Sequence, residues 1–449
     1  MMRQDSMKYI RELSKKIPVM AETDVLVVGS GPGGLSAAAR EGVKVILVER
    51  FGCFGGNITQ AMVEGIAWYR HEKTVDAGGI GVELETRAKA MGASQKDPEA
   101  LAELLDADMF KCVADTMVQE AGVVPLLYCH AVDAVMERDT IKGIITESKS
   151  GRQAIAAQRV IDATGDADIA FHAGAPCVKS DKREMMKATV NFGCSGVDVE
   201  RFISYVKKNP SHLRDWARET AGKEEDLFNT YIEEPFLKAR EAGEIPEGVD
   251  IYGFWDGLTD AGEATNINVV RLSDIDPTDV RDLTRAEMEG KRQALMALEA
   301  LKKYTPGFEH AKLRTFGSSV GIRESRKIRG EYTLRGEEVR NEARFSDSVG
   351  IFPEFLDAYG VVIIPTTGRY FQVPYGVLVP RGVNNLLVAG RCVSGDRVAF
   401  AATRQMMCCC VSGQGAGVAS AESVKEGVSC REVDVSRVQE ALKKQGVRI

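Results

Sequence analysis

Three glycines and one acid near the start of the chain have the spacing of a dinucleotide-binding site. Gly29, Gly31 and Gly34 fit the pattern G-x-G-x-x-G, and Glu49 follows Gly29 by about 20 residues. In this pattern the first glycine permits a tight turn, the second lets a pyrophosphate approach bare backbone, and the third lets a helix pack on a strand. The amides at a helix start attract phosphates. The Glu49 carboxylate can accept hydrogen bonds from both hydroxyl groups of a ribose.

The segments around these residues have the order that such a site requires. Asp24–Val28 is an apolar, β-branched run typical of a buried parallel strand, Leu35–Arg40 favours a helix, and Val43–Val48 is a second strand. The competing interpretation is a glycine-rich surface loop, but the complete order of strand, turn, helix and strand favours the dinucleotide site. The helix is short, with only about two turns before Gly42.

Three later segments of small residues also favour close approach of a ligand to the backbone. Gly55 and Gly56 follow soon after the ribose-binding acid, although a simple turn would also explain them. Ala163–Asp166 follows one predicted buried strand, and Gly390-Arg391 follows the last one. The small-residue turn at Ala163–Asp166 lets the backbone lie near a cofactor, and Asp166 could bind a sugar hydroxyl.

A long helix is predicted near the end of the chain, after Asp396 and up to about Glu426. Its start, near Arg404–Met406, would direct amides and the positive end of the helix dipole at an electron-rich ring. Cys408–Cys410 lies within this helix, and consecutive helical positions point about 100° apart, so these thiols cannot share one metal. The glycines predicted to pack against the first strand–helix unit are Gly413, Gly415 and Gly417.

Candidates for substrate chemistry come from cations and aromatic residues outside the glycine motifs. The segment 321–330 is rich in cations, and it is either a clamp for an anionic substrate or a solvated face. Its expected pocket members are Arg323 and Arg326. Arg404 is a further candidate, as are His71 and Tyr375, although a histidine beside aromatics and a buried tyrosine are both often structural. Cys53 has no partner cysteine nearby in the sequence and is interpreted as a packing residue.

The composition narrows the class of protein. The chain has 449 residues, 58 Lys and Arg against 65 Asp and Glu, and a net charge of −7, with no basic block. This balance argues against nucleic acid and anionic membranes as partners. Ten cysteines occur without paired metal-ligand spacing, and we find neither a signal peptide nor a membrane-spanning run. The sequence therefore predicts a cytoplasmic protein with free thiols and no metal site.

The predicted fold class is α/β, with a Rossmann-like parallel sheet, an inserted β-meander and an inserted α+β substrate domain. The meander consists of His130–Glu137, Ile141–Ser148 and Gln153–Ala156, and Arg159–Asp162 then returns to the parallel sheet. The predicted divisions are an arm at 1–22, a cofactor domain at 23–175 and 366–430, a substrate domain at 176–365, and a C-terminal helix at 431–449. Within the substrate domain, helices are predicted at Phe202–Val206, Leu213–Thr220 and Leu283–Tyr304, and 221–262 is interpreted as irregular.

The set of motifs resembles a known family. GSGPGG, VERFGCFGGN, VIDATGDADIA, GIRESRKIRGEYTL and NLLVAGRCVSGD occur in this order, followed by a terminal helix that contains GQGAG. The set is similar to bacterial FAD-dependent oxidoreductases related to the flavin subunit of heterodisulfide reductase, within the glutathione-reductase-like flavoproteins. The resemblance covers most of the chain, from about Ile17 to Ala421, and is weakest at 195–310. The iron–sulfur cysteine motifs of heterodisulfide reductase and a second nucleotide-binding unit are both absent from the sequence.

This resemblance implies FAD as the cofactor and assigns its contacts. It implies pyrophosphate at Gly31–Gly34, ribose at Glu49, adenine near Arg50 and Val132, and the flavin beside Gly55–Ile58. It places Asp166 and Asp396 along the ribityl chain and the amides of Gln405 and Met406 near the pyrimidine edge of the ring. The full set of predicted cofactor residues is Gly29, Gly31, Pro32, Gly33, Gly34, Glu49, Arg50, Gly55, Gly56, Asn57, Ile58, Val132, Ala163, Thr164, Gly165, Asp166, Gly390, Arg391, Asp396, Gln405 and Met406.

The predicted function is that of an FAD-dependent dehydrogenase or reductase. Flavin N5 would exchange a hydride with a small, anionic organic substrate, and an external acceptor or donor would complete the cycle. Two alternatives stay open, a flavin monooxygenase and an electron-transfer subunit of a larger complex. A homo-oligomer is also compatible with the sequence.

Overall fold

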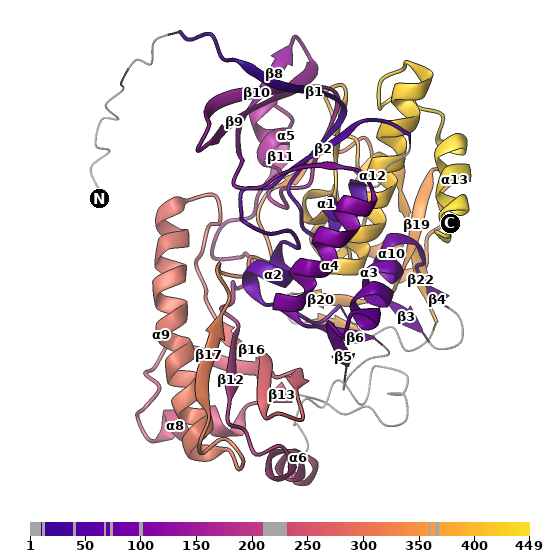
Figure 1. The fold of residues 1–449 in the computed structure, drawn as a ribbon. Helices are drawn as coiled ribbons and strands as arrows, with labels where there is room; N and C mark the ends of the chain where they lie inside the picture. The colour runs from indigo at the N-terminus through magenta and orange to yellow at the C-terminus, as the bar shows by residue number, and fades with distance from the viewer. Residues whose placement is uncertain are drawn as a thin grey trace.

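The computed structural model describes residue 10 and residues 14–38, 42–66, 69–71, 75–97, 102–209, 231–358, 361–363 and 368–449. Elements from the two ends of the sequence share one part of the molecule, in indigo and yellow in Figure 1. Elements from the middle of the chain, in pink and salmon, gather in the other part, at the lower left. The cofactor motifs therefore come together from opposite ends of the chain.

Five parallel strands form the centre of the first part. Their order is β7 (Val124–Leu126), β2 (Val45–Val48), β1 (Val19–Val28), β10 (Gly151–Asp162) and β23 (Leu386–Val388). Taken in chain order this arrangement is 3-2-1-4-5, as in a Rossmann-type sheet. The β1 residues Val25–Val28 and all of β2 are buried, as expected for parallel strands covered on both faces. The predicted strands at 24–28, 43–48 and 385–389 are confirmed, with starts that differ by one to five residues and ends that differ by at most one.

The inserted meander differs from its prediction in one respect. β8 (His130–Glu137) pairs with β9 (Thr140–Ser148), and β9 pairs with Gly151–Ala156 at the start of β10, both antiparallel. The end of β10, Val160–Asp162, pairs with β23 in parallel. The predicted separation between a third meander strand and a returning parallel strand is therefore wrong. β1 pairs along β10 from Ala154 to Asp162 and keeps it extended.

A long buried helix, α12 (Met406–Glu426), packs against the short helix α1 (Pro32–Ala37). A Cβ added at Gly413 would overlap the Gly33 carbonyl oxygen, and one at Gly417 would lie 2.5 Å from the Ala37 carbonyl oxygen. The predicted glycine contact with the first strand–helix unit is confirmed for these two residues. It is wrong for Gly415, whose added Cβ would meet Val349, because this position faces another side of the helix.

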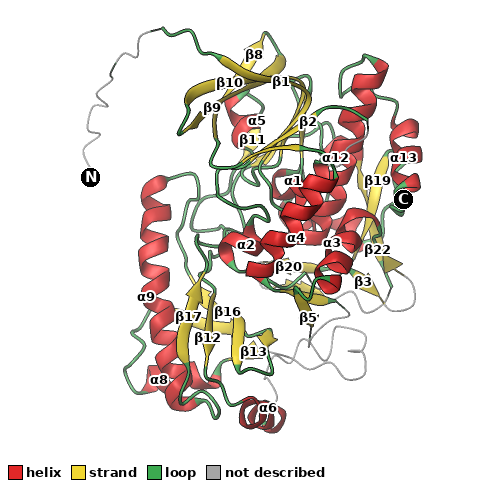
Figure 2. Ribbon diagram, viewed as in Figure 1, coloured by secondary structure: helices red, strands yellow, loops and turns green. Residues whose placement is uncertain are grey.

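The second part is an antiparallel sheet with helices beside it (Figure 2). Its strands have the order β13-β14-β16-β12-β17, with β15 on β16. The prediction that 221–262 is irregular is wrong where the structure describes it, because an antiparallel sheet and a helix form there. The predicted helix Leu213–Thr220 lies outside the described residues. The bounds are β12 (Phe192–Ser195), α6 (Val199–Lys208), β13 (Tyr231–Ile232), α8 (Glu234–Glu241), β14 (Asp250–Phe254), β15 (Gly257–Leu258), β16 (Glu263–Arg271), α9 (Val280–Tyr304) and β17 (Lys312–Phe316).

The two apolar cores divide the chain differently from the predicted boundaries. The second core contains buried residues from Ala188 to Ile322. Ile328, Leu334 and Phe352 already belong to the first core. The remaining elements are α2 (Asn57–Ala61), β3 (Arg70–His71), β4 (Val75–Asp76), α3 (Gly79–Ala90), β5 (Ser94–Lys96), β6 (Glu103–Leu105), α4 (Ala107–Glu120), α5 (Asp168–His172), β11 (Cys177–Val178), β18 (Lys327–Ile328), α10 (Gly336–Arg340), β19 (Ser348–Pro353), β20 (Leu356–Ala358), β21 (Val361–Ile363), β22 (Tyr370–Pro374), η1 (Tyr375–Val377), η2 (Gly390–Cys392), α11 (Arg397–Thr403) and α13 (Val435–Lys444).

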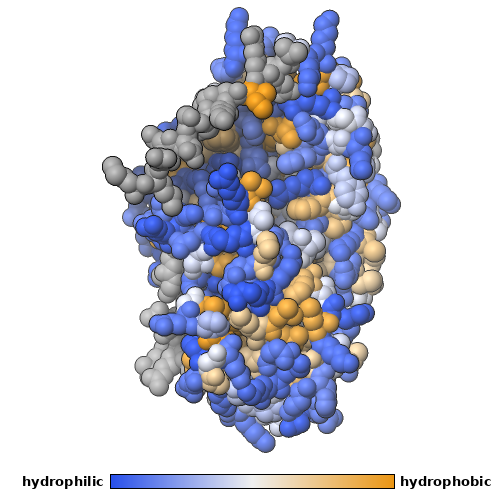
Figure 3. Space-filling view, turned by 90° about the vertical axis from the view of Figure 1, so that its left-hand side faces the viewer, coloured by the Kyte–Doolittle hydropathy of each residue, from blue (hydrophilic) through white to orange (hydrophobic). Residues whose placement is uncertain are grey.

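The surface is that of an ordinary globular protein. The face shown in Figure 3 is mainly hydrophilic, with apolar residues scattered in its lower half. Among the described helices, none is long and apolar enough to cross a bilayer.

The buried Glu64 lies where the two parts meet and gives a testable pH dependence. It accepts hydrogen bonds from the Ala107 amide and the Thr265 side chain, yet burial raises its pKa to about 7. The folded state therefore binds a proton that the unfolded state releases above about pH 4.5. This contribution to stability is complete at low pH and is lost as the pH rises through 7.

We expect Glu64→Gln to stabilise the protein relative to wild type as the pH rises from 4.5 to 8. The gain should approach about 3 kcal/mol, because one pKa unit is worth about 1.4 kcal/mol. Urea unfolding at several pH values measures it. Glu137→Gln, at an exposed acid of β8, is the control. Parallel pH profiles of wild type and Glu64→Gln would contradict the expectation.

Candidate active site

A cavity of about 410 Å³ lies where the parallel strands end. Gly29–Gly33 follows β1, Glu49–Phe51 follows β2, Ala163–Asp166 follows β10, and Gly390-Arg391 follows β23; all four segments line it. Ligands of open α/β sheets bind in the crevice outside the carboxyl ends of the strands. The predicted cofactor segments are thus brought together at the expected edge of the sheet.

The three motif glycines are needed for different reasons. Gly29 has a φ of +96°, and an added Cβ would lie 2.5 Å from the Ala163 carbonyl oxygen; at Gly34 it would overlap the Gly29 carbonyl oxygen. The fold itself therefore requires these two. Gly31 has a φ of −64°, which any residue adopts, and its added Cβ would meet only the Gly56 Cα at 3.8 Å. Since Gly31 lines the cavity, the bare backbone there fits a closely approaching ligand such as a pyrophosphate.

Glu49 is held in place at the cavity wall. Its Oε2 accepts hydrogen bonds from the Ser30 amide at 2.9 Å and the Ser30 hydroxyl at 2.5 Å, and its Oε1 accepts one from the Phe51 amide at 2.9 Å. The side chain is buried. Carboxylate oxygens accept more than one hydrogen bond each, so this orientation leaves acceptor capacity for ribose hydroxyls. Arg50 lies beside Glu49 in the wall.

The loop after β2 lies directly on the dinucleotide loop. The Gly55 amide donates to the Ser30 carbonyl at 2.9 Å, and an added Cβ at Gly56 would lie 2.6 Å from the Gly31 Cα. Gly56 and Asn57 line the cavity, whereas Gly55 and Ile58 do not. The prediction of ligand contact is corrected for these two, because Gly55 supports the loop from behind and Ile58 is buried in the first core.

On the opposite wall, Asp166 and Arg391 form an ion pair at the cavity. The Arg391 Nη2 lies 3.1 Å from the Asp166 Oδ1, and the Ser325 hydroxyl donates to the same oxygen at 2.5 Å. Arg391 Nη1 also donates to the Ile322 carbonyl, and the Asn57 side chain donates to it at 3.1 Å. These bonds connect the cofactor loops to the segment that follows β17.

Besides Gly34, Gly55 and Ile58, three further predicted cofactor residues do not line the cavity. The Asp396 carboxylate accepts bonds from the amides of Val398, Ala399 and Gly336 at 2.8–2.9 Å, so it caps α11 instead. The Gln405 amide, predicted to face the ring, donates instead to the Ala402 carbonyl at 3.1 Å, whereas Met406 lines the cavity. On the adenine side the wall consists of Cys129, His130 and Ala131 rather than Val132.

Two predicted catalytic residues have structural roles. Arg326 pairs with Asp168 at 2.8 Å and lies over the Phe171 ring, outside the cavity wall. The Tyr375 hydroxyl is buried and donates to the Cys430 carbonyl at 2.6 Å, and burial raises its pKa well above the usual value. Neither is therefore available to a substrate. His71 lies in β3, and its side chain is outside the described part of the structure.

The other two predicted cations lie close to the cavity. Arg404 lines it and donates to the Asp357 carboxylate at 2.6 Å. Arg323 follows the wall residue Ile322 and donates to the Lys187 carbonyl at 2.8 Å. Burial, Arg271 and Arg404 lower the Arg323 pKa to about 9.

Sequence reasoning missed the wall that the second part contributes. Leu283 and Glu287 of α9, Ser319 and Val320 close the cavity together with Gln60 of α2. They belong to no motif, and only the packing of the two parts brings them to the sheet edge. The Glu287 carboxylate accepts the Val320 amide at 2.6 Å, which fixes this segment.

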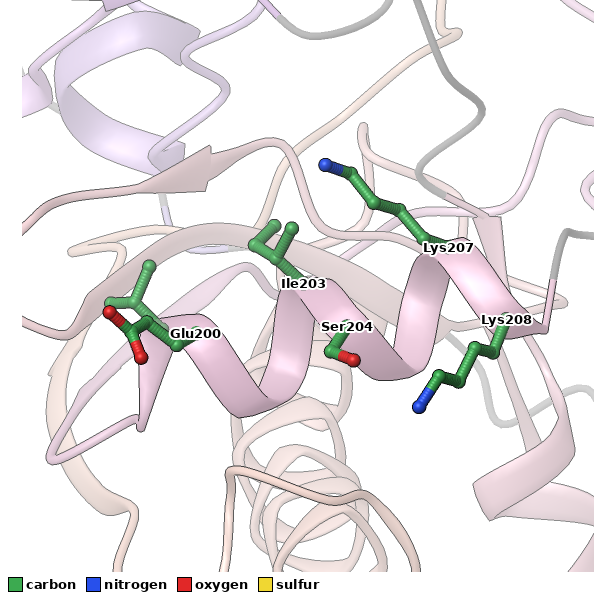
Figure 4. Close-up of a pocket in the computed structure, with 6 residues that line it drawn as sticks. Glu200, Ile203, Ser204, Lys207 and Lys208 are labelled. Carbon is green, nitrogen blue, oxygen red and sulfur yellow. The ribbon is translucent and has the colours of Figure 1, made fainter.

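A second hollow lies elsewhere, on α6, and all of its lining residues belong to that helix (Figure 4). It contains none of the predicted site residues. Within the described residues, no group of three His, Cys, Asp or Glu side chains is placed to hold a metal ion.

Comparison with known proteins gives the family. Residues 24–442 match the family described as FAD dependent oxidoreductase. The chain belongs to this FAD-dependent oxidoreductase family. The predictions of an FAD-dependent enzyme and of FAD as its cofactor are confirmed. When bound, FAD supplies a two-electron hydride acceptor or donor.

Individual relatives of this FAD-dependent oxidoreductase are more distant. Thiamine thiazole synthase of Methanococcus vannielii is 31% identical over 166 residues, 32% of the present chain and 57% of that enzyme. Thiamine thiazole synthase of Methanococcus maripaludis is 29% identical over 171 residues. The match covers 34% of this chain and 59% of that enzyme. The chain thus spans less than two-thirds of the length of these curated relatives. A geranylgeranyl bacteriochlorophyll reductase-like structure from Thermoplasma acidophilum has 14% identity and a TM-score of 0.47, with 94% of this chain and 83% of that chain covered.

We expect Glu49→Ala to weaken FAD binding by about 10- to 100-fold, the effect of losing one or two hydrogen bonds to a charged acceptor. The loss of this acid also leaves the Ser30 and Phe51 donors without their present acceptor. Titration of apoprotein with FAD, followed by flavin fluorescence, measures the change. Glu147→Ala, an exposed acid on β9, serves as the control. Equal affinity of wild type and Glu49→Ala would argue against the ribose assignment.

Proposed function

We propose that this enzyme exchanges a hydride between FAD and a small anionic organic substrate, held where the two parts of the chain meet. The observation that carries the proposal is the composition of the cavity wall. One end consists of the dinucleotide loops, and Arg404, Ser319 and Val320 lie in the same wall. A single cavity thus joins the cofactor loops to a buried cation.

The residues of the chain would act mainly by binding and positioning. The glycine loop and Glu49 hold the dinucleotide end. The Asp166–Arg391 pair and its bonds to Ser325 and Ile322 connect the cofactor loops to the second part. Walls from both parts restrict the access of water to the reacting end, and a cation balances the charge of the substrate.

Several finer assignments belong to this proposal. The kinship with the flavin subunit of heterodisulfide reductase, the external electron partner, the cytoplasmic location and a homo-oligomer remain predictions. The thiazole synthase matches cover only about a third of the chain, and we therefore do not extend the activity of those enzymes to it.

Purified protein tests the proposed function directly. We expect a flavin absorbance spectrum that bleaches under anaerobic conditions when one class of anionic compound is added, and that returns with an artificial acceptor. The same compounds converted to neutral amides or esters should leave the flavin oxidised. Bleaching only by NAD(P)H, with substrate oxygenation in air, would instead identify a monooxygenase. Purification in a stable complex with another redox protein, without bleaching by any small molecule, would identify an electron-transfer subunit.

A further inference from the structure

Three arginines from distant segments converge beside the cavity. Arg271 ends β16 of the second part, Arg323 follows the wall residue Ile322, and Arg404 follows α11. Of these three, the sequence predicts only Arg323 and Arg404 as site residues. Arg271 lies in the segment where the family resemblance is weakest, and it reaches this place through the sheet of the second part.

Two of these arginines, Arg271 and Arg323, approach the same side-chain amide oxygen, that of Asn268. The Asn268 Oδ1 accepts from Arg271 Nη1 and lies 3.5 Å from Arg323 Nη2, while the Thr189 hydroxyl donates to it at 2.8 Å. Two like-charged guanidinium groups are thus within reach of a single neutral oxygen. Such an arrangement is unfavourable unless an anion offsets it.

Arg404 connects this cluster to the cavity. Its side chain is 10% exposed, and Nη2 donates to the carboxylate and the carbonyl of Asp357. Its Nε is buried and has no hydrogen-bond partner among the described residues. A buried N–H of a charged group without an acceptor is rare, and at a cavity wall it favours binding of a ligand oxygen.

The charges near the cluster leave an excess of positive charge. Burial alone would raise the pKa of Asp357, but Arg404, Arg323 and Arg271 together lower it. Among the described carboxylates, Asp357 thus interacts with all three cations, although only Arg404 bonds to it. Lys187 is paired with Asp250 at 2.5 Å, and Asp256 is a further carboxylate that acts on Arg271 more weakly than Asp357 does.

We propose that Arg404 binds a carboxylate group of the substrate, and that Arg271 and Arg323 stabilise this anion from behind. The inference rests on the proposed function and names the substrate class. A carboxylate is favoured because the cluster already binds one, that of Asp357, and because the planar guanidinium group matches carboxylate oxygens. Arg404 is the contact residue, and the other two are positioning residues.

The test uses the FAD-loaded enzyme and three probes: malonate, its neutral diamide malonamide, and inorganic phosphate. Each is titrated under nonreducing conditions, and the difference spectrum of the flavin reports binding. We expect a saturable change with malonate and none with malonamide. Equal responses to malonate and malonamide, no response to malonate, or tighter binding of phosphate would overturn the carboxylate assignment.

Variants separate the contact residue from the positioning residues. Arg404→Gln should weaken malonate about 10- to 100-fold, the value of a charge-assisted hydrogen bond. Arg271→Gln and Arg323→Gln should weaken it less, with an effect that shrinks as salt is added. Arg314→Gln, on the exposed side of β17, is the matched control. An equal loss in Arg314→Gln, or none in Arg271→Gln, would contradict the cluster.

Two further measurements keep this test independent of the proposed function. Flavin content and reduction by dithionite show whether each variant retains its cofactor. If Arg404→Gln loses FAD, malonate binding by Arg271→Gln decides the test, because Arg271 is not part of the cavity wall. Malonate binding without bleaching by any substrate would refute the hydride reaction and leave the carboxylate site intact.

Discussion

Replacing Gly31 by valine should yield a folded protein that binds FAD much more weakly than the wild type does. The Gly31 Cβ position opens into the cavity, so the valine methyl groups would occupy the space of the pyrophosphate without disturbing the fold. Overpacking of a filled site costs about 1–3 kcal/mol, which corresponds to about a 5- to 150-fold loss of affinity. The absorbance ratio of flavin to protein after purification, followed by titration with FAD, measures this loss.

Gly65→Val is the matched control for this experiment. Gly65 is also in the first half of the chain, and its added Cβ would meet only Leu104 and Asn266 side-chain atoms at 3.7 and 3.9 Å, away from the cavity. We expect normal FAD content in this variant. Full FAD occupancy in Gly31→Val, with the affinity of the wild type, would show that the dinucleotide lies elsewhere.

The second large effect concerns stability. Gly413→Ala should destabilise the protein by about 3 kcal/mol, because the new methyl group would overlap the Gly33 carbonyl and force α12 away from α1. Alanine is favoured over glycine inside a helix by about 1 kcal/mol, so the expected sign is opposite to that of helix propensity. A stabilised variant would therefore refute the close contact.

Urea unfolding of the apoprotein is the appropriate measurement, because it separates this effect from cofactor binding. Gly415→Ala provides a comparison in the same helix. Its methyl group would meet the Val349 side chain at 2.8 Å rather than rigid backbone, and we expect a smaller loss. Similar losses in both variants would indicate a general effect of the helix instead of the contact with Gly33.

The cofactor end of the cavity could be predicted well because its residues lie close together in the sequence and are positioned by local structure. Gly29, Gly34 and Glu49 belong to one strand–turn–helix–strand unit, and their spacing alone fixes their relative positions. The strand at 385–389 is confirmed for the same reason, since it is a continuous apolar segment with its own start and end. The predicted helix from Asp396 to Glu426 is confirmed from Met406 onward, but its first part is a separate helix, α11.

The residues at the substrate end of the cavity could not be predicted as fully from the sequence. Arg271 and Arg404 both come near Asp357 through the packing of two separate cores, which no spacing in the sequence records. Arg326 and Arg323 are three residues apart in one loop, yet one pairs with Asp168 and the other enters the cluster. Asp396 has the position of a cofactor ligand in a motif, but the backbone turns there and uses its carboxylate as a helix cap.

The continuous strand β10 and its partner β23 have a consequence for biosynthesis. β10 needs β23 to complete its parallel edge, and β23 is encoded only at Leu386–Val388, near the end of the chain. The middle segment, whose buried residues run from Ala188 to Ile322, is complete on the ribosome much earlier. We therefore expect the walls of the FAD cavity to be complete only after β23 and the start of α12 have been synthesised, later than both the N-terminal strands and the middle segment.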